Sequence, residues 1–260
     1  PTPHLYCDDE SVIGSAFYIV SYEAGRVFWN AQLDGTTRDE RAAIYADMNA
    51  GLARLHAFDV EQLGLADFGA RGGYLSRNLA RWSKVYRQSE LVDIADMNWL
   101  IEQLPGRLPA TEPSCLVHGD YGLYNIVIGP QRPSLAAVLD WEMATLGDPY
   151  VDLAHHLRAW WEPADDRGAA TSLRGHDLAA LGIPSMNEYV ARYCRNAGIV
   201  EIPHWRFYLG FAQFRYAAMI QGILKRAAIG TATGRAVLHR QVRVAEIAAL
   251  ARRTLEGAAE

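Results

Sequence analysis

The chain has 260 residues, of which 50% are hydrophobic and 21% charged, and its formal net charge is −5. This composition is typical of a folded globular protein and excludes a disordered chain. The negative charge argues against a nucleic-acid-binding protein, which usually carries a basic patch. Cys7, Cys115 and Cys194 lie far apart with no CxxC pair, which excludes a dense disulfide framework and favours the cytoplasm. No apolar run is long enough to span a membrane, and no signal-peptide pattern opens the chain.

The first part of the chain predicts one strand and then three helices. Residues 17–22 are aromatic and β-branched and precede a turn, which indicates a short strand. Thr37 and Glu40 have capping-box spacing, so a helix is expected to begin there. The glycine-rich loop 69–73 is interpreted as the turn that enters the second helix. Apolar residues recur at helical spacing in three sets: Ile44, Met48, Leu52 and Leu55; Leu75, Leu79, Trp82 and Tyr86; Met97, Leu100, Ile101 and Leu104.

The middle of the chain changes to short β-like runs, and helices then resume. The runs are 115–118, 125–128 and 135–139, separated by turn residues. Asp148 and Pro149 predict the start of a helix that continues to Trp161. Further helices are expected from the capping box Ser185–Glu188 to a stop at Gly198, over the nearly apolar stretch 204–229, and over the amphipathic tail 235–255. The sequence therefore predicts an α+β protein, mostly helical, with a small β-unit between residues 115 and 140.

Polar residues gather around this β-unit. Asp120 follows the first run, Asn125 opens the second, and Asp140 closes the third. Any one of them could be simple turn chemistry, since Asp and Asn bond to their own backbone in loops. A hairpin from 125 to 140, however, would bring Asn125 and Asp140 together with Asp120 in the loop just ahead. Two oxygen ligands suit Mg²⁺ beside a phosphate, and a nearby carboxylate can accept a proton from an attacking hydroxyl.

Three segments resemble the aminoglycoside phosphotransferase (choline kinase-like) family, whose members have a protein-kinase-like fold. Residues 116–125, Leu-Val-His-Gly-Asp-Tyr-Gly-Leu-Tyr-Asn, resemble its catalytic loop. Residues 138–142 are similar to its metal-binding segment and residues 147–154 to the stretch that follows. Further segments resemble the branch of phosphotransferase-like domains fused to, or encoded beside, acyl-CoA dehydrogenases: 17–20, 25–29, 80–84 and 221–227.

The resemblance implies a domain organisation and a set of residue roles. Residues 30–260 would form the helical large lobe, and residues 1–29 the hinge segment at the end of the small lobe. The implied roles are catalytic base for Asp120, Mg²⁺ ligands for Asn125 and Asp140, support of the catalytic loop for His118 and Asp152, and contact with the nucleotide through the hinge backbone for Ser21, Tyr22 and Glu23. Gly122 and Tyr124 depart from the family pattern, in which charged residues often stand at these positions.

The implied function is ATP- and Mg²⁺-dependent phosphorylation of a hydroxyl on a small molecule, either aminoglycoside-like or a hydroxyacyl metabolite. Besides that substrate, the implied partners are an acyl-CoA dehydrogenase or a second copy of the chain, with no nucleic acid and no membrane. Only sixteen residues precede Phe17, so the chain is expected to start at the hinge without the phosphate-covering loop and lysine of the small lobe. A non-catalytic kinase-like binding or scaffolding domain is the alternative. A metal-dependent phosphohydrolase using His118, Asp120 and His155 is a third interpretation, but it lacks metal-ligand spacing.

Several other residues are interpreted as structural. Adjacent helical histidines point about 100° apart, so His155 and His156 are expected at the surface or in packing rather than on one metal. Cys115 is expected to be a small buried residue. The aromatic residues are expected to pack in the core, namely Trp160, Trp161, Trp205, Phe207, Phe211 and Phe214. The acidic residues after the metal segment are expected in a solvated loop, namely Glu162, Asp165 and Asp166.

Overall fold

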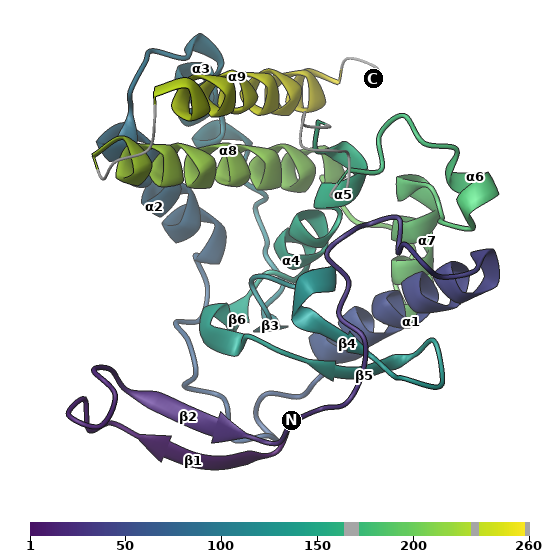
Figure 1. Ribbon diagram of the computed structural model, residues 1–260. Coiled ribbons are helices and arrows are strands. Elements are labelled where there is room, and N and C mark those ends of the chain that lie inside the picture. Colours follow the sequence, from purple (N-terminus) through teal and green to yellow (C-terminus); the bar gives the residue numbers. More distant parts are fainter. Residues whose placement is uncertain (164–171, 230–233, 258–260) are drawn as a thin grey trace.

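The computed structural model describes residues 1–163, 172–229 and 234–257, the stretch 234–241 through its backbone alone. These residues form a mostly helical body with small antiparallel two-stranded sheets (Figure 1). The strands are β1 (Pro3–Cys7), β2 (Phe17–Val20), β3 (Cys115–Val117), β4 (Ile126–Ile128), β5 (Leu135–Val138) and β6 (Thr145–Gly147). The α-helices are α1 (Arg38–His56), α2 (Tyr74–Ser89), α3 (Ala95–Gln103), α4 (Pro149–His156), α5 (Arg158–Trp161), α6 (Leu178–Leu181), α7 (Met186–Ala197), α8 (Trp205–Ile229) and α9 (Gly234–Glu256). Short 3₁₀ turns lie at Pro105–Arg107, Leu123–Asn125 and Trp141–Met143.

Local signals set the ends of the predicted helices. At the start of α1, the Thr37 hydroxyl accepts a hydrogen bond from the Glu40 backbone N–H, and the Glu40 carboxylate accepts one from the Thr37 N–H. The same capping box stands at Ser185 before α7, which ends at Gly198 in the left-handed region with a φ of 69°. Each box satisfies N–H groups that have no partner inside the helix. The predicted helix starts and the glycine stop are confirmed.

The strands place the middle of the chain between two helical groups. In Figure 1 the β1–β2 hairpin extends away from the body, β3–β6 and β4–β5 lie beside α1 and α4, and α8 and α9 pack on α2 and α3. Strand β4 pairs with β5 in the register Ile126↔Val138. Strands β1 and β6 and helix α6 were not predicted, because such short segments show no clear periodicity. The helix expected to reach Trp161 is interrupted at Leu157, whose ψ of 9° separates α4 from α5.

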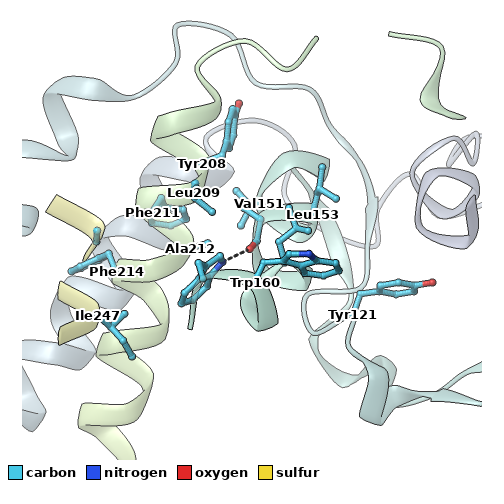
Figure 2. Close-up of a cluster of buried hydrophobic side chains, with 14 of the residues drawn as sticks. Tyr121, Val151, Leu153, Trp160, Tyr208, Leu209, Phe211, Ala212, Phe214 and Ile247 are labelled. Carbon is cyan, nitrogen blue, oxygen red and sulfur yellow. Dashed lines mark hydrogen bonds between the residues drawn. The ribbon is translucent and has the colours of Figure 1, made fainter. Parts of the chain in front are cut away.

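Helix α8 is the centre of the hydrophobic core. It packs against α9, α2 and α4. Phe211 and Phe214 lie on its buried face (Figure 2), and Phe207 and Phe211 stack with ring centroids 5.9 Å apart. Trp161 and Phe214 are also fully buried, so the aromatic residues do pack in the core. Helix α8 is nearly apolar all round because it is covered on several sides. None of the described helices is long and apolar enough to cross a membrane.

Three smaller expectations have clear outcomes. Cys115 is buried in β3, and burial raises the pKa of its thiol, as expected for a structural cysteine. The turn entering α2 is confirmed, since Gly73 stands at its N-cap with a φ of 62°. The solvated-loop interpretation is wrong for Glu162, which is 1% exposed. Its carboxylate forms ion pairs with Arg158 and Arg243, which compensate the buried charge. Asp165 and Asp166 lie outside the described residues.

Candidate active site

The predicted hairpin brings two of the candidate residues to one place. Asn125 ends the 3₁₀ turn before β4, and its carbonyl accepts a hydrogen bond of 2.8 Å from the backbone N–H of Leu139, just after β5. Asp140 is the next residue along the chain and has left-handed backbone angles, φ 61° and ψ 65°. Asp is one of the few residue types that tolerates this conformation. Asn125 and Asp140 therefore stand at the same end of the β4–β5 hairpin, beside the loop that carries Asp120.

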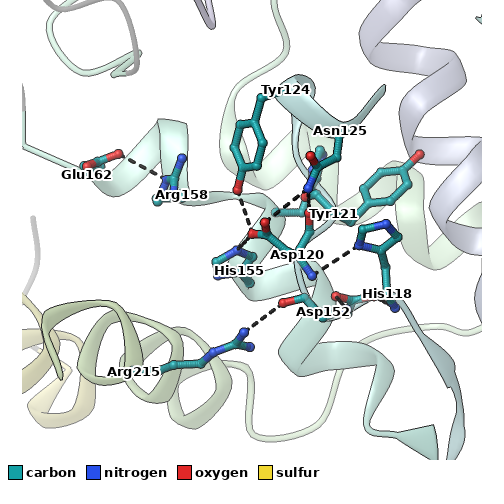
Figure 3. A network of polar contacts seen from close by, with 12 residues as sticks. His118, Asp120, Tyr121, Tyr124, Asn125, Asp152, His155, Arg158, Glu162 and Arg215 are labelled. Carbon is teal, nitrogen blue, oxygen red and sulfur yellow. Dashed lines mark hydrogen bonds and ion pairs between the residues drawn. The ribbon is translucent and has the colours of Figure 1, made fainter. Parts of the chain in front are cut away.

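The Asp120 carboxylate is fixed by side chains on both of its oxygens (Figure 3). Oδ1 accepts hydrogen bonds from the Tyr124 hydroxyl at 2.7 Å and from His155 Nε2 at 2.9 Å. Oδ2 accepts one from Asn125 Nδ2 at 3.1 Å. The side chain is nevertheless 31% exposed, so it remains open to a reacting group. A carboxylate held in one orientation and partly open is suited to accept a proton from a bound hydroxyl.

The protonation states around Asp120 follow from burial and hydrogen bonding. Burial lowers the pKa of His155, and its Nδ1 is buried with no partner among the described residues. The neutral imidazole therefore donates from Nε2, because a charged ring would leave a buried Nδ1–H unsatisfied. Burial opposes ionisation of Asp120. The bonds from His155 and Tyr124 and the charge of Arg158 outweigh burial and lower the pKa of the Asp120 carboxyl. Asp120 is thus an ionised acceptor at neutral pH.

His118 supports the loop through both ring nitrogens. Its Nδ1 accepts the backbone N–H of Asp120 at 3.3 Å, so its proton lies on Nε2, which donates to the Leu139 carbonyl at 2.9 Å. The ring also lies against Trp141, with centroids 4.8 Å apart. Since neither nitrogen is free to bind a metal, the phosphohydrolase interpretation loses one of its three ligands.

Asp152, on helix α4, binds the backbone of the same loop. It is 2% exposed, and its two oxygens accept the backbone N–H groups of His118 at 2.8 Å and Gly119 at 2.9 Å. His56 Nε2 lies 3.2 Å from Oδ2. Burial opposes ionisation, but the bonds from His56 and the loop outweigh it and lower the pKa of Asp152 to about 2. A buried anion on α4 thus fixes the turn that presents Asp120.

The residues present fit a magnesium ion beside a phosphate. Asn125 turns its amide nitrogen to the carbonyl and carboxylate of Asp120, which leaves its Oδ1 as a ligand oxygen. Asp140 is exposed at the same end of the hairpin. No group of three His, Cys, Asp or Glu side chains within the described residues could hold a metal. One amide and one carboxylate oxygen is nevertheless the sparse set that Mg²⁺ uses when phosphate oxygens and water complete its shell.

The hinge candidates lie in the segment between β2 and α1. The Ser21 hydroxyl donates to the Glu23 carboxylate at 2.6 Å, while Tyr22 is 89% exposed. This segment is tied to the β4 strand by reciprocal backbone bonds between Arg26 and Ile128, of 2.7 and 2.9 Å. Gly25 permits the approach, because a Cβ there would lie 2.4 Å from the Ile128 carbonyl oxygen. The nucleotide-binding role of Ser21, Tyr22 and Glu23 stays a prediction.

The phosphotransferase interpretation gave no role to two residues that contact Asp120, although the phosphohydrolase interpretation had grouped one of them, His155, with it. His155 was expected in packing or at the surface, and it is buried with its ring on the Asp120 carboxylate. The available signal was its position three residues after Asp152, which puts both on one face of α4. Tyr124 was noted only as a departure from the family pattern. The packing expectation is confirmed for His156, whose ring nitrogens lie on the Tyr121 carbonyl and the Tyr189 hydroxyl.

Comparison with known proteins places the chain in a family. The model of the phosphotransferase enzyme family matches residues 1–189. Acyl-CoA dehydrogenase family member 10 of Mus musculus is 40% identical over 233 residues, covering 90% of this chain and 22% of that protein. Acyl-CoA dehydrogenase family member 11 of Homo sapiens is 38% identical over 232 residues, covering 88% of this chain and 29% of that protein. The chain thus spans less than a third of the curated relatives it matches.

Solved structures give the same result for the fold. The crystal structure of a candidate aminoglycoside phosphotransferase from Ralstonia eutropha JMP134 has a TM-score of 0.89 and 38% identity, covering all of this chain and 79% of that one. A thermostable mutant of aminoglycoside phosphotransferase APH(4)-Ia has a TM-score of 0.62 at 17% identity, covering 100% of this chain and 79% of that one. At that identity the likeness shows the fold alone. The chain belongs to the phosphotransferase enzyme family, and its mostly helical α+β fold matches the kinase-like fold of the aminoglycoside phosphotransferases.

Proposed function

We propose that the chain transfers the terminal phosphoryl group of ATP to a hydroxyl of a small molecule in a Mg²⁺-dependent reaction. The observation that carries the proposal is the Asp120 carboxylate, which is ionised and partly exposed. It is held by hydrogen bonds from Tyr124, Asn125 and His155. Phosphoryl transfer needs mainly positioning and charge stabilisation, with one acceptor for the proton of the nucleophile. Family membership supports the reaction class.

Each residue has a stated part in this proposal. The acceptor oxygen forms a bond to the terminal phosphorus, its proton passes to Asp120, and the bond from phosphorus to the bridging oxygen breaks to release ADP. Asn125 Oδ1 and the Asp140 carboxylate would hold Mg²⁺. When bound there, the ion would neutralise charge on the nucleotide phosphates. His118 and Asp152 keep the loop backbone in place, and the backbone of 21–23 would meet the adenine.

Nucleotide use is supported by solved structures of the same fold. Aminoglycoside phosphotransferase structures with TM-scores of 0.50 to 0.59 include an ADP-bound form and a complex with GDP and kanamycin. ATP is the phosphoryl donor proposed for this chain. Unpaired Cys7, Cys115 and Cys194 support a cytoplasmic site for the reaction.

The acceptor is proposed to be a hydroxylated acyl compound rather than an aminoglycoside. The support is that the curated relatives at 32% to 40% identity are named as acyl-CoA dehydrogenases or members of that family. An acyl-CoA dehydrogenase is the corresponding proposed partner. If the two act in sequence, phosphorylation of the hydroxyl would convert it into a better leaving group.

The test combines binding and turnover in one set of variants. Calorimetry with Mg-ATP should show binding that Asp140→Asn weakens strongly, while Asp120→Asn leaves it within about threefold. In a coupled ADP-release assay with hydroxyacyl acceptors, Asp120→Asn should lower kcat by about 10²–10⁴-fold. Asp39→Asn is the control, since this exposed side chain pairs with neighbouring Arg38 and lies outside the catalytic loop. Mg-ATP binding with no transfer to any hydroxyl acceptor would replace this proposal with a non-catalytic binding domain.

A further inference from the structure

A cavity of about 480 Å³ lies beside the catalytic loop. Helix α2, helix α8 and the segment 142–146 form its walls, and Gly119, the residue directly before Asp120, is part of its lining. The charged residues of the lining are Arg77, Arg81, Glu142 and Arg215. Three arginines against one glutamate give this cavity a positive charge, although the chain as a whole is negative.

Arg215 is the deepest of the three arginines. It is 7% exposed, and its Nη2 donates to the Gly119 carbonyl at 2.8 Å (Figure 3). A guanidinium has five N–H groups, and within the described residues this one has no carboxylate partner. Holding a buried cation without a counterion is costly. The remaining donors of Arg215 are therefore available to an anion that enters the cavity.

A second group of arginines, which is partly buried, shows the contrast. Arg158 and Arg243 lie close to α8 as well, and both pair with the buried carboxylate of Glu162. The fold thus supplies an acidic partner for these two partly buried guanidinium groups. Among the described residues, Arg215 meets a carbonyl oxygen and an aromatic ring and no carboxylate.

Trp82 joins two of the arginines. The Cζ atoms of Arg81 and Arg215 each lie 5.6 Å from its ring centroid. The Trp82 indole N–H is buried and has no acceptor among the described residues. Arg77 stands nearby, bonded to the carbonyls of Ala70 at 3.0 Å and Gly72 and to no described carboxylate. The Trp82 ring thus holds two guanidinium groups that have no carboxylate partner among the described residues. Their N–H groups remain available to a ligand.

We propose that this cavity binds an oxyanion of the acceptor molecule, a carboxylate or a phosphate, through Arg215 and Arg81, so that the acceptor hydroxyl is presented to Asp120. Guanidinium groups bind planar carboxylates and phosphates through paired N–H bonds. The inference rests on the proposed function and narrows its substrate class. An acceptor rich in amino groups would meet like charges here, so the cavity selects an anionic hydroxylated compound over an aminoglycoside.

Binding is tested without turnover, with small probes. The ¹⁵N–¹H NMR signal of the Trp82 indole, assigned by its loss in Trp82→Phe, is followed during titration with acetate, inorganic phosphate or acetamide at constant ionic strength. We expect a saturable shift with at least one anion and none with acetamide, the neutral analogue of acetate. Tighter binding of acetate would identify a carboxylate as the recognised group, and tighter binding of phosphate a phosphate ester.

The variants separate the cavity from general charge effects. Arg81→Gln should weaken anion binding about tenfold, and it is expected to fold because Arg81 is exposed. Arg215→Lys keeps the charge but loses the paired geometry and should also weaken binding. Arg253→Gln, an exposed position on α9, is the matched control and should leave the dissociation constant unchanged. Absence of a saturable shift with either anion, or equal affinities in Arg81→Gln and Arg253→Gln, would overturn the inference.

Competition with nucleotide separates this inference from the proposed function. Saturating Mg-ADP should leave the anion affinity within about twofold, because the cavity serves the acceptor. Displacement of the anion by Mg-ADP would assign the cavity to nucleotide phosphates and refute the acceptor role. If the chain transfers phosphoryl groups but binds no anion in this cavity, the anion site is refuted and the proposed function stands. Anion binding with the expected variant pattern, in a chain that transfers nothing, leaves the anion site standing and defeats the proposed function.

Discussion

Asp152→Asn tests whether one buried carboxylate on α4 holds the catalytic loop. The Asp152 side chain is buried. Its two oxygens accept the backbone N–H groups of His118 and Gly119 in the loop. Asparagine has nearly the same shape, but one of its two terminal groups is an NH₂ that would face an N–H donor. The substitution therefore removes the charge and leaves at least one buried donor without an acceptor.

Two arguments give the size of the expected loss in unfolding free energy. The pKa of Asp152 falls from an ordinary 3.8 to about 2 on folding. At 1.36 kcal/mol per pH unit the shift corresponds to roughly 2–3 kcal/mol of stability at neutral pH. Loss of a hydrogen bond to a charged group gives a similar figure, about 1.5–3 kcal/mol. Because the folded-state pKa is depressed, this stability is fully present above about pH 4 and is lost as pH falls through about 2.

Urea denaturation followed by tryptophan fluorescence measures the effect. At pH 7, Asp152→Asn should lower the free energy of unfolding by roughly 2–3 kcal/mol, and the difference from the unsubstituted chain should shrink as pH falls from 4 toward 2. Asp39→Asn, with a side chain 97% exposed, should change it by less than about 0.5 kcal/mol. Two results would refute the reasoning: a loss of unfolding free energy at pH 7 as small as that of the control, or a loss at pH 2.5 as large as that at pH 7. Either would show that the ionised Asp152 carboxylate does not stabilise the fold.

Other substitutions test separate parts of the fold. Burial raises the pKa of Asp148 to about 7. The stability that its protonated form contributes is therefore fully present below about pH 4 and is lost as pH rises through 7. In thermal denaturation, the melting temperature of Asp148→Asn relative to that of the unsubstituted chain should be higher at pH 8 than at pH 5. A Cβ at Gly210 would lie 2.7 Å from Leu255 Cγ, so Gly210→Ala should cost about 1–3 kcal/mol in urea unfolding, with partial recovery in the Leu255→Ala background. Glu112 accepts the first two backbone N–H groups of α2 at 2.8 and 2.9 Å, so Glu112→Ala should cost about 1–2 kcal/mol and speed hydrogen exchange in that turn only.

The features that the sequence predicts correctly are those decided within a few residues. The capping boxes at Thr37 and Ser185 join groups three residues apart, and both form as predicted. The turn and strand residues between 125 and 140 are likewise close enough in the chain for their hairpin, and the proximity of Asn125 to Asp140, to be anticipated. Local spacing is sufficient here because the interacting atoms are brought together by the helix or strand geometry itself.

The partners of Asp120 and its loop were decided by tertiary packing. His155 and His156 are neighbours on one helix, yet one ring lies on Asp120 and the other between Tyr121 and Tyr189. The 100° turn between adjacent helical residues separates them, but only the docking of α4 under the loop determines which ring meets the carboxylate.

The same holds for charges whose partners lie far away in the chain. Glu112 caps α2 from 37 and 38 residues away, and Arg215 reaches Gly119 across 96. Glu162 looked like part of a solvated acidic loop until α8 and α9 covered it. The sequence by itself determined most of the helices, the hairpin and the residue types at the site. Which buried charges are paired, and which remain open to a ligand, was decided when distant segments packed together, because burial and counterions depend on neighbours that no local pattern specifies.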